Sequence, residues 1–120
     1  MGRLLILDDD PTVGQILQVA AKSVGFEARW CEDVDAFFSA LAEWQPTHLA
    51  VDMLMPDVSG QEVLARLADQ RCEAKVIVSS GMGAGELDTV LDEAQALGLN
   101  TVGTLPKPFS LASVRALLAA

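Results

Sequence analysis

Short runs of aliphatic residues alternate along this chain with longer stretches whose apolar residues recur at helical spacing. The short runs predict five strands, at residues 4–7, 27–30, 48–52, 75–80 and 100–105. Runs without polar alternation are typical of strands that are buried on both faces of a parallel sheet. The run at 27–30 is more polar than the others, which favours a place at the edge of the sheet.

Helix signals stand between these strands. Asp10 and Asp33 are good N-cap residues, and Ser59 with Glu62 forms the S-x-x-E pattern of a capping box. Glycines follow the first and the fourth helical stretch, as is common where helices end. The predicted helices lie at 11–24, from the cap at 33 to 44, from the cap at 59 to about 69, at 86–97 and at 111–118.

Five βα units in series predict an α/β fold, a doubly wound parallel sheet with helices on both faces and right-handed connections. We expect the (βα)5 arrangement with the flavodoxin-like strand order 2-1-3-4-5. A chain of 120 residues fits one domain, spanning residues 1–120. In such sheets the functional crevice lies at the carboxyl ends of the strands.

Composition excludes several classes of function. The net charge of −9 and the eight scattered basic residues disfavour direct binding to nucleic acid. No apolar stretch is long enough for a membrane span and no signal peptide opens the chain, so we expect a cytoplasmic protein without membrane contact. Cys31 and Cys72 are far apart, which argues against structural zinc and a disulfide framework. Trp30 and Trp44 are interpreted as packing residues.

Side chains with useful chemistry stand where the predicted strands end. They are Asp8, Asp9 and Asp10 after the first strand, Asp52 at the third, Ser80 at the fourth and Lys107 shortly after the fifth. Neighbouring carboxylates repel one another, and a divalent cation would offset that repulsion. Magnesium prefers oxygen ligands. A carboxylate, magnesium, a hydroxyl and an ammonium group together are what phosphoryl transfer requires.

Four motifs at these strand ends, "ILDDDP", "AVDMLMPDVSG", "VIVSSG" and "LPKPF", resemble those of the receiver domain of two-component response regulators. The resemblance covers the whole chain. It implies that Asp52 is the phosphoacceptor, that Ser80 is the switch hydroxyl and that Lys107 is the conserved-type lysine. It further implies a Mg²⁺ site made by Asp8, Asp9, Asp52 and the backbone carbonyl of Leu54. Asp10 is then mostly a helix cap, and the Lys107–Pro108 bond is often cis in the family.

The resemblance implies a signalling switch rather than an enzyme, a domain that catalyses only its own phosphoryl transfer and dephosphorylation. A histidine kinase or phosphotransfer protein would phosphorylate Asp52, and the face made by the fourth helix, fifth strand and fifth helix would then change. That face would control an output domain or a downstream effector, with room for a phosphorylation-dependent dimer. The ending "ALLAA" is typical of a domain excised from a longer regulator.

The strongest alternative is a Mg²⁺-dependent phosphatase of the haloacid-dehalogenase type. Asp8, Asp10 and Thr12 match its D-x-D-x-T motif, with Asp8 as the nucleophile, and Ser80 and Lys107 could supply its second and third motifs. Against it, residues 108–120 lack the further acidic pair that this family needs, and the motif that follows the third strand stays unexplained.

Three positions depart from the receiver pattern. Thr104 stands where many receivers carry an aromatic switch residue, which puts that switch in doubt and suggests a different relay through the last two helices. Leu54 and Met82 stand where many receivers place polar groups that orient water, and we hypothesise that this apolar flank slows hydrolysis of the phosphoaspartate. His48, the only histidine, is expected to be a strand-edge residue rather than a ligand.

Overall fold

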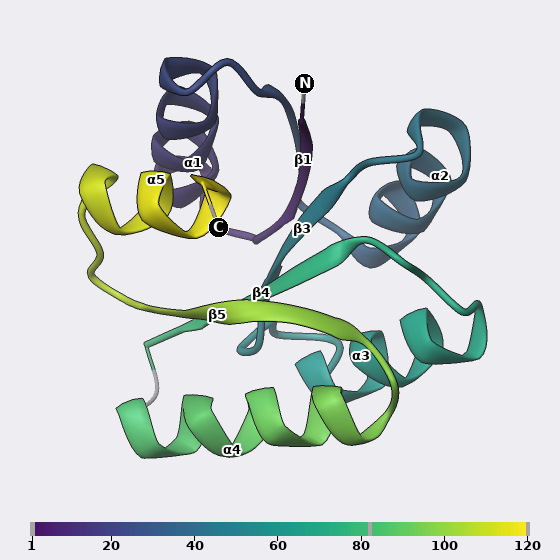
Figure 1. The fold of residues 1–120 in the computed structure, drawn as a ribbon. Coiled ribbons are helices and arrows are strands. Elements are labelled where there is room, and N and C mark those ends of the chain that lie inside the picture. Colours follow the sequence, from purple (N-terminus) through teal and green to yellow (C-terminus); the bar gives the residue numbers. More distant parts are fainter. Residues whose placement is uncertain (1, 82, 120) are drawn as a thin grey trace.

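The computed structural model describes residues 2–81 and 83–119. Strands and helices alternate along this part of the chain, five of each (Figure 1). The strands are β1 (Arg3–Leu7), β2 (Glu27–Cys31), β3 (His48–Asp52), β4 (Lys75–Ser80) and β5 (Asn100–Pro106). The helices are α1 (Pro11–Ser23), α2 (Val34–Trp44), α3 (Gly60–Asp69), α4 (Ala84–Ala96) and α5 (Leu111–Ala119).

The strands form one parallel sheet in the order β2-β1-β3-β4-β5, which confirms the predicted topology. The polar strand β2 lies at an edge, as its composition predicted. Leu7 pairs with Val51 across β1 and β3, and Asp52 pairs with Ser79 across β3 and β4. The carboxyl ends of the three central strands therefore lie beside one another.

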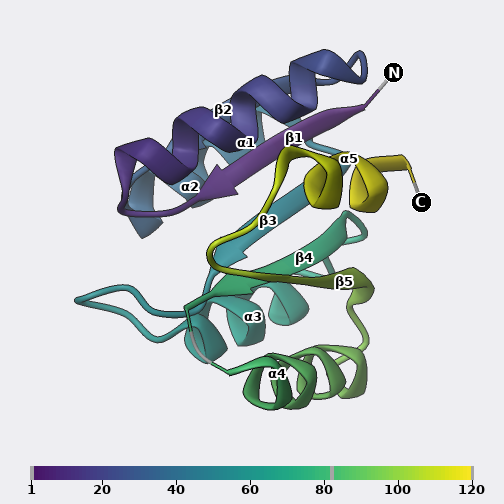
Figure 2. The ribbon, with the colours of Figure 1, turned by 90° about the vertical axis from the view of Figure 1, so that its left-hand side faces the viewer.

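Helices cover both faces of the sheet. Helices α1 and α5 pack on one face, and α2, α3 and α4 on the other (Figures 1 and 2). Alternate residues of the central strands point to the two cores, so Leu5 and Leu7 join one while Leu4 and Ile6 join the other. Both sets are buried, as the unbroken apolar runs predicted. None of the described helices has the length and apolar character that crossing a membrane requires.

Side-chain caps fix the starts of three helices as predicted. The carboxylates of Asp10 and Asp33 accept hydrogen bonds from the N–H groups of Thr12 and Ala36, at 2.9 and 2.8 Å. The hydroxyl of Ser59 accepts a hydrogen bond from the backbone N–H of Glu62 at 3.2 Å, which is one half of the predicted capping box. Helix α4 begins two residues before its predicted start at 86. The carbonyl of Gly83 accepts its first helical hydrogen bonds, so glycine takes the cap position there.

His48 is more buried than a strand-edge residue would be. It begins the central strand β3 and its side chain is only 7% exposed. Its ring meets Phe26 edge-on with centroids 5.0 Å apart, and its Nδ1 lies 2.8 Å from the hydroxyl of Thr47. Within the described residues, its buried Nε2 has no hydrogen-bond partner. The prediction underestimated this burial because Phe26, between α1 and β2, packs against the imidazole ring.

Candidate functional site

Three carboxylates converge where β1 and β3 end. Asp8, Asp9 and Asp52 each offer one oxygen, and the three oxygens lie within 4.8 Å of one another. Asp8 and Asp52 are 1% and 2% exposed, while Asp9 faces solvent. Because β1 and β3 are paired neighbours in the sheet, residues that are more than 40 positions apart along the chain meet here.

Lys107 supplies positive charge to this cluster. Its Nζ lies 2.9 Å from Oδ2 of Asp8 and 3.5 Å from Oδ2 of Asp52. Burial disfavours the charged ammonium, but the hydrogen bond to Asp8 and the charges of both carboxylates outweigh it and raise the pKa of Lys107. The lysine therefore stays protonated. The Lys107–Pro108 peptide bond is cis, as the family resemblance implies.

Asp52 is held in surroundings that favour its neutral form. Burial, followed by the charges of Asp8 and Asp9, raises the pKa of Asp52 to about 6, although the N–H of Leu54 and the charge of Lys107 act in the opposite direction. That N–H donates to Oδ1 of Asp52 at 3.1 Å. A carboxylate with a raised pKa at the floor of such a site is a typical functional group.

The donor set fits a hard divalent cation. Three carboxylates, of which Asp8 and Asp52 are buried, face one ammonium group, so negative charge remains uncompensated at this edge of the sheet. Magnesium prefers oxygen ligands and retains several waters, and the exposed side of Asp9 leaves room for water. Leu54 follows Asp52 closely and its N–H contacts that carboxylate, while the ligand role of its carbonyl stays a prediction.

Ser80 lies at the same edge of the sheet, at the end of β4. It is fully buried, and its carbonyl accepts a hydrogen bond from the N–H of Lys107 at 2.9 Å. The neighbouring serine has another task, because the hydroxyl of Ser79 donates to the carbonyl of Leu105 at 3.0 Å. Ser80 is thus tied to Lys107 through the backbone, and the role of its hydroxyl stays a prediction.

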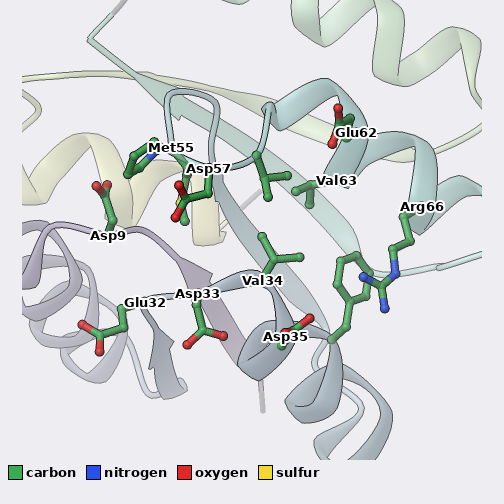
Figure 3. Close-up of a pocket in the computed structure, with 13 residues that line it drawn as sticks. Asp9, Glu32, Asp33, Val34, Asp35, Met55, Asp57, Glu62, Val63 and Arg66 are labelled. Carbon is green, nitrogen blue, oxygen red and sulfur yellow. The ribbon is translucent and has the colours of Figure 1, made fainter.

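An acidic hollow of about 650 Å³ opens beside Asp9 (Figure 3). It lies between the start of α2, the loop from β3 to α3, and α3 itself. Its charged lining consists of Asp9, Glu32, Asp33, Asp35, Asp57, Glu62 and Arg66. Six carboxylates and one guanidinium give this hollow a net negative charge, which attracts cations toward the exposed carboxylate of Asp9.

The sequence did not identify one neighbour of the cluster. Trp30, interpreted as a packing residue, donates its indole N–H to the backbone carbonyl of Asp8 at 2.7 Å. Its ring also packs against Gly14 in α1. A glycine inside a predicted helix was the available signal, because such a position often marks a close approach. Trp44, in contrast, is buried in the core as expected.

Comparisons with known proteins agree with this geometry. The model of the response regulator receiver domain matches residues 4–119. The transcriptional regulatory protein QseB of Haemophilus influenzae is 28% identical over 98% of this chain and 51% of its own length. The transcriptional regulator RpaA of Synechocystis is 29% identical over 98% of this chain and 49% of its own length. This chain therefore spans about half the length of these curated relatives.

Solved structures share the fold. The chemotaxis protein CheY4 of Vibrio cholerae superposes with a TM-score of 0.84 at 20% identity, covering 99% of this chain and 97% of that one. A response regulator from Colwellia psychrerythraea has a TM-score of 0.81 at 28% identity, covering 98% of this chain and 94% of that one.

These matches overturn the phosphatase alternative. In that interpretation Asp8 is the nucleophile and Asp10 the general acid, but the Asp10 carboxylate caps α1 and lies outside the acidic cluster found among the described residues. The carboxylate of Asp8 is instead occupied by Lys107 and by the N–H of Asp10. A family model that covers nearly the whole chain, with the acidic cluster at the expected strand ends, leads to one conclusion: the chain belongs to the receiver domains of two-component response regulators, which are signalling domains rather than metabolic enzymes.

Proposed function

We propose that residues 1–120 act as one receiver domain and that Asp52 accepts a phosphoryl group from the phosphohistidine of a histidine kinase or phosphotransfer protein. The observation that carries this proposal is the position of Asp52, a buried carboxylate whose Oδ2 lies 3.5 Å from the ammonium of Lys107. Asp8, Asp9, Asp52 and the carbonyl of Leu54 would hold Mg²⁺. When bound, this ion would supply positive charge to the phosphoryl oxygens.

The transfer itself needs little covalent chemistry from the protein. An oxygen of Asp52 attacks phosphorus, the bond from phosphorus to the donor imidazole nitrogen breaks, and that nitrogen keeps the electron pair. Lys107 stabilises charge on the phosphoryl oxygens, which is the usual role of an ammonium group at such a centre. The N–H of Leu54, which donates to Oδ1 of Asp52, helps to hold the carboxylate in place.

We infer a docking surface for the phosphoryl donor on α1 and the start of α5. A hollow of about 380 Å³ is lined mainly by residues of α1 and the start of α5, listed as Thr12, Gln15, Ile16, Val19, Phe109 and Leu111. Val19 is 52% exposed and Ile16 is 36% exposed, and exposed apolar side chains that gather in one place are a common mark of an interaction surface. We infer that a helix of the phosphoryl donor docks on this apolar surface and brings its histidine to the sheet edge.

Phosphorylation would act as a switch on the face made by α4, β5 and α5. The new charge, about −1.5 to −2 at neutral pH, would draw the Ser80 hydroxyl and Lys107 inward and bias the ends of β4 and β5. The backbone hydrogen bond between these two residues supports a joint movement. Thr104, partly buried on β5, stands at the position where many receivers carry an aromatic switch residue. We therefore infer that the signal is relayed through the backbone and the last two helices.

The output would be a linked domain or a separate effector. Curated relatives are named as transcriptional regulators and are about twice as long as this chain. We propose that the α4–β5–α5 face controls such an output, with dimerisation on phosphorylation as one route. The binding of nucleic acid would then belong to the output, because this chain carries a net charge of −9.

Intact mass after incubation with acetyl phosphate tests the proposal. We expect a gain of one phosphoryl group, about 80 Da and labile as an acyl phosphate, only with Mg²⁺ present. Asp52→Asn should abolish the gain, whereas Asp57→Asn, an exposed aspartate in the following loop, should retain it. A phosphoryl group on another carboxylate, or no gain in any variant, would contradict the proposal.

A further inference from the structure

Trp30 clamps the end of β1 through the backbone. It lies near the end of β2, and its indole N–H donates to the carbonyl oxygen of Asp8 at 2.7 Å. The backbone N–H of Asp8 donates to the carbonyl of Cys31 at 3.2 Å. Both polar groups of the Asp8 backbone are therefore held by β2, one by its main chain and the other by a side chain.

Helix α1 is built to admit the indole ring. A Cβ atom at Gly14 would lie 2.7 Å from atoms of the Trp30 ring, which is closer than a side chain tolerates. Glycine is the least favourable residue in a helix interior apart from proline, so its presence in α1 is explained by this contact. The ring is thus fixed between β2 and the first turns of the helix that follows the acidic cluster.

The clamp acts on the peptide that joins Asp8 to Asp9. On the other side of Asp9, the N–H of Asp10 donates to Oδ1 of Asp8 at 2.9 Å. The two peptide groups that flank Asp9 are therefore anchored, while its own carboxylate is exposed to solvent. A ligand whose backbone is fixed loses less conformational freedom when it binds a cation.

We propose that Trp30 is a positioning residue of the metal site, which holds the Asp8–Asp9 peptide so that the Asp9 carboxylate is oriented for Mg²⁺. This inference rests on the proposed function of the acidic cluster. It separates two roles that a tryptophan can have here. Packing needs only the ring, whereas positioning needs the indole N–H.

The test is isothermal titration calorimetry of MgCl₂ into the whole chain. Trp30→Phe keeps an aromatic ring and removes the N–H, and we expect about threefold to tenfold weaker Mg²⁺ binding, the effect of one hydrogen bond. Trp44→Phe is the matched control, because Trp44 is the other tryptophan of the chain and lies in the core. It should bind Mg²⁺ within about twofold of the wild type even if its thermal midpoint falls.

A second measurement uses the native Trp30. In Trp44→Phe this residue is the sole tryptophan, so we expect its emission to change with Mg²⁺ at the calorimetric dissociation constant. Asp9→Asn should remove that change. Trp44→Phe should still be phosphorylated by acetyl phosphate to the wild-type extent, because Trp44 lies in the core and outside the metal site.

The outcomes separate this inference from the proposed function. Unchanged Mg²⁺ affinity in folded Trp30→Phe would overturn the positioning role while leaving the receiver chemistry intact. If Trp30→Phe does not fold, the Trp44→Phe protein provides the test. Fluorescence emission of Trp30 that does not change on addition of Mg²⁺ would then overturn the positioning role. A wild-type protein that binds no Mg²⁺ and gains no phosphoryl group would overturn the proposed function together with the inference.

Discussion

Asp52 is kept in a state that folding alone does not favour. Its carboxylate is 2% exposed, shares its surroundings with buried Asp8, and has only part of the charge of Lys107 to compensate it. A core residue of this kind is retained for chemistry rather than for stability. The raised pKa of Asp52 reflects how unfavourable this buried environment is for its charged form.

Removing this charge should stabilise the protein when no metal is present. The pKa of Asp52 rises from its ordinary value of 3.8 to about 6 on folding, so the ionised form is disfavoured in the native state. Native stability should accordingly fall as pH rises between these values. At pH 7 we expect Asp52→Asn to gain about 1 to 3 kcal/mol. Urea unfolding in EDTA at about pH 4 and pH 7 measures this gain, and equal gains at both values would contradict it.

His48 should make stability fall in acid. Burial, followed by the charge of Lys75, lowers the pKa of His48 below its ordinary value of 6.5. The unfolded chain therefore takes up a proton first as pH falls through 6.5, and the native state loses stability below that value. His48→Leu should lose less stability than the wild type between pH 7.5 and pH 5.5. If the free energy of unfolding falls by the same amount in both proteins over this range, His48 is not the group responsible.

Leu54 should protect the phosphoaspartate from water. It is 59% exposed and lies two residues after the acceptor Asp52 in the loop. The partner residue in this hypothesis, Met82, lies outside the described residues. Leu54→Asn introduces groups that can hydrogen-bond a water, and we expect phosphate loss to become about fivefold faster, the effect of one hydrogen bond. Leu97→Asn, at another exposed leucine, is the control, and an unchanged lifetime in Leu54→Asn would refute the hypothesis.

At the scale of the helices, two glycines have different surroundings, and we expect opposite effects on stability when each is replaced by alanine. Gly14 in α1 faces the Trp30 ring, where a Cβ would lie 2.7 Å away, whereas a Cβ at Gly85 in α4 would meet nothing within 4 Å. Gly14→Ala should therefore destabilise the protein by about 1 to 3 kcal/mol through overpacking. Gly85→Ala should stabilise it by up to about 1 kcal/mol through helix propensity. Chemical denaturation of both variants checks the pair, and effects of the same sign would contradict the contact with the ring.

The elements were predictable where local chemistry decides them. The caps at Asp10, Asp33 and Ser59 act on neighbouring N–H groups, so the sequence alone locates these helix starts. The start of α4 was missed because Gly83 offers no side chain to recognise. A bulge between β4 and β5 leaves Val102 without a register partner, and this irregularity has no local signal because it depends on how two strands pack.

The site was predictable at the scale of the whole molecule because parallel strands end at one edge. Asp8, Asp9, Asp52 and Lys107 needed only the topology to be brought together. Their individual environments did not follow from topology, since the sequence could not distinguish buried Asp8 from exposed Asp9. The contact of Trp30 was equally hidden, because a side-chain bond from β2 to a backbone carbonyl depends on the exact approach of α1.

Mg²⁺ should stabilise the entire fold through this one edge. An ion that binds only the native state adds about 2.7 kcal/mol at a concentration of 100 times its dissociation constant. Asp9→Asn removes one ligand and should lose most of that gain, whereas Asp57→Asn, an exposed acid that lines the same hollow, should keep it. Denaturant unfolding in MgCl₂, against NaCl of equal ionic strength, separates binding from screening of the net charge of −9. If both variants respond like the wild type, the cation acts on the acidic surface in general and the cluster is not its site.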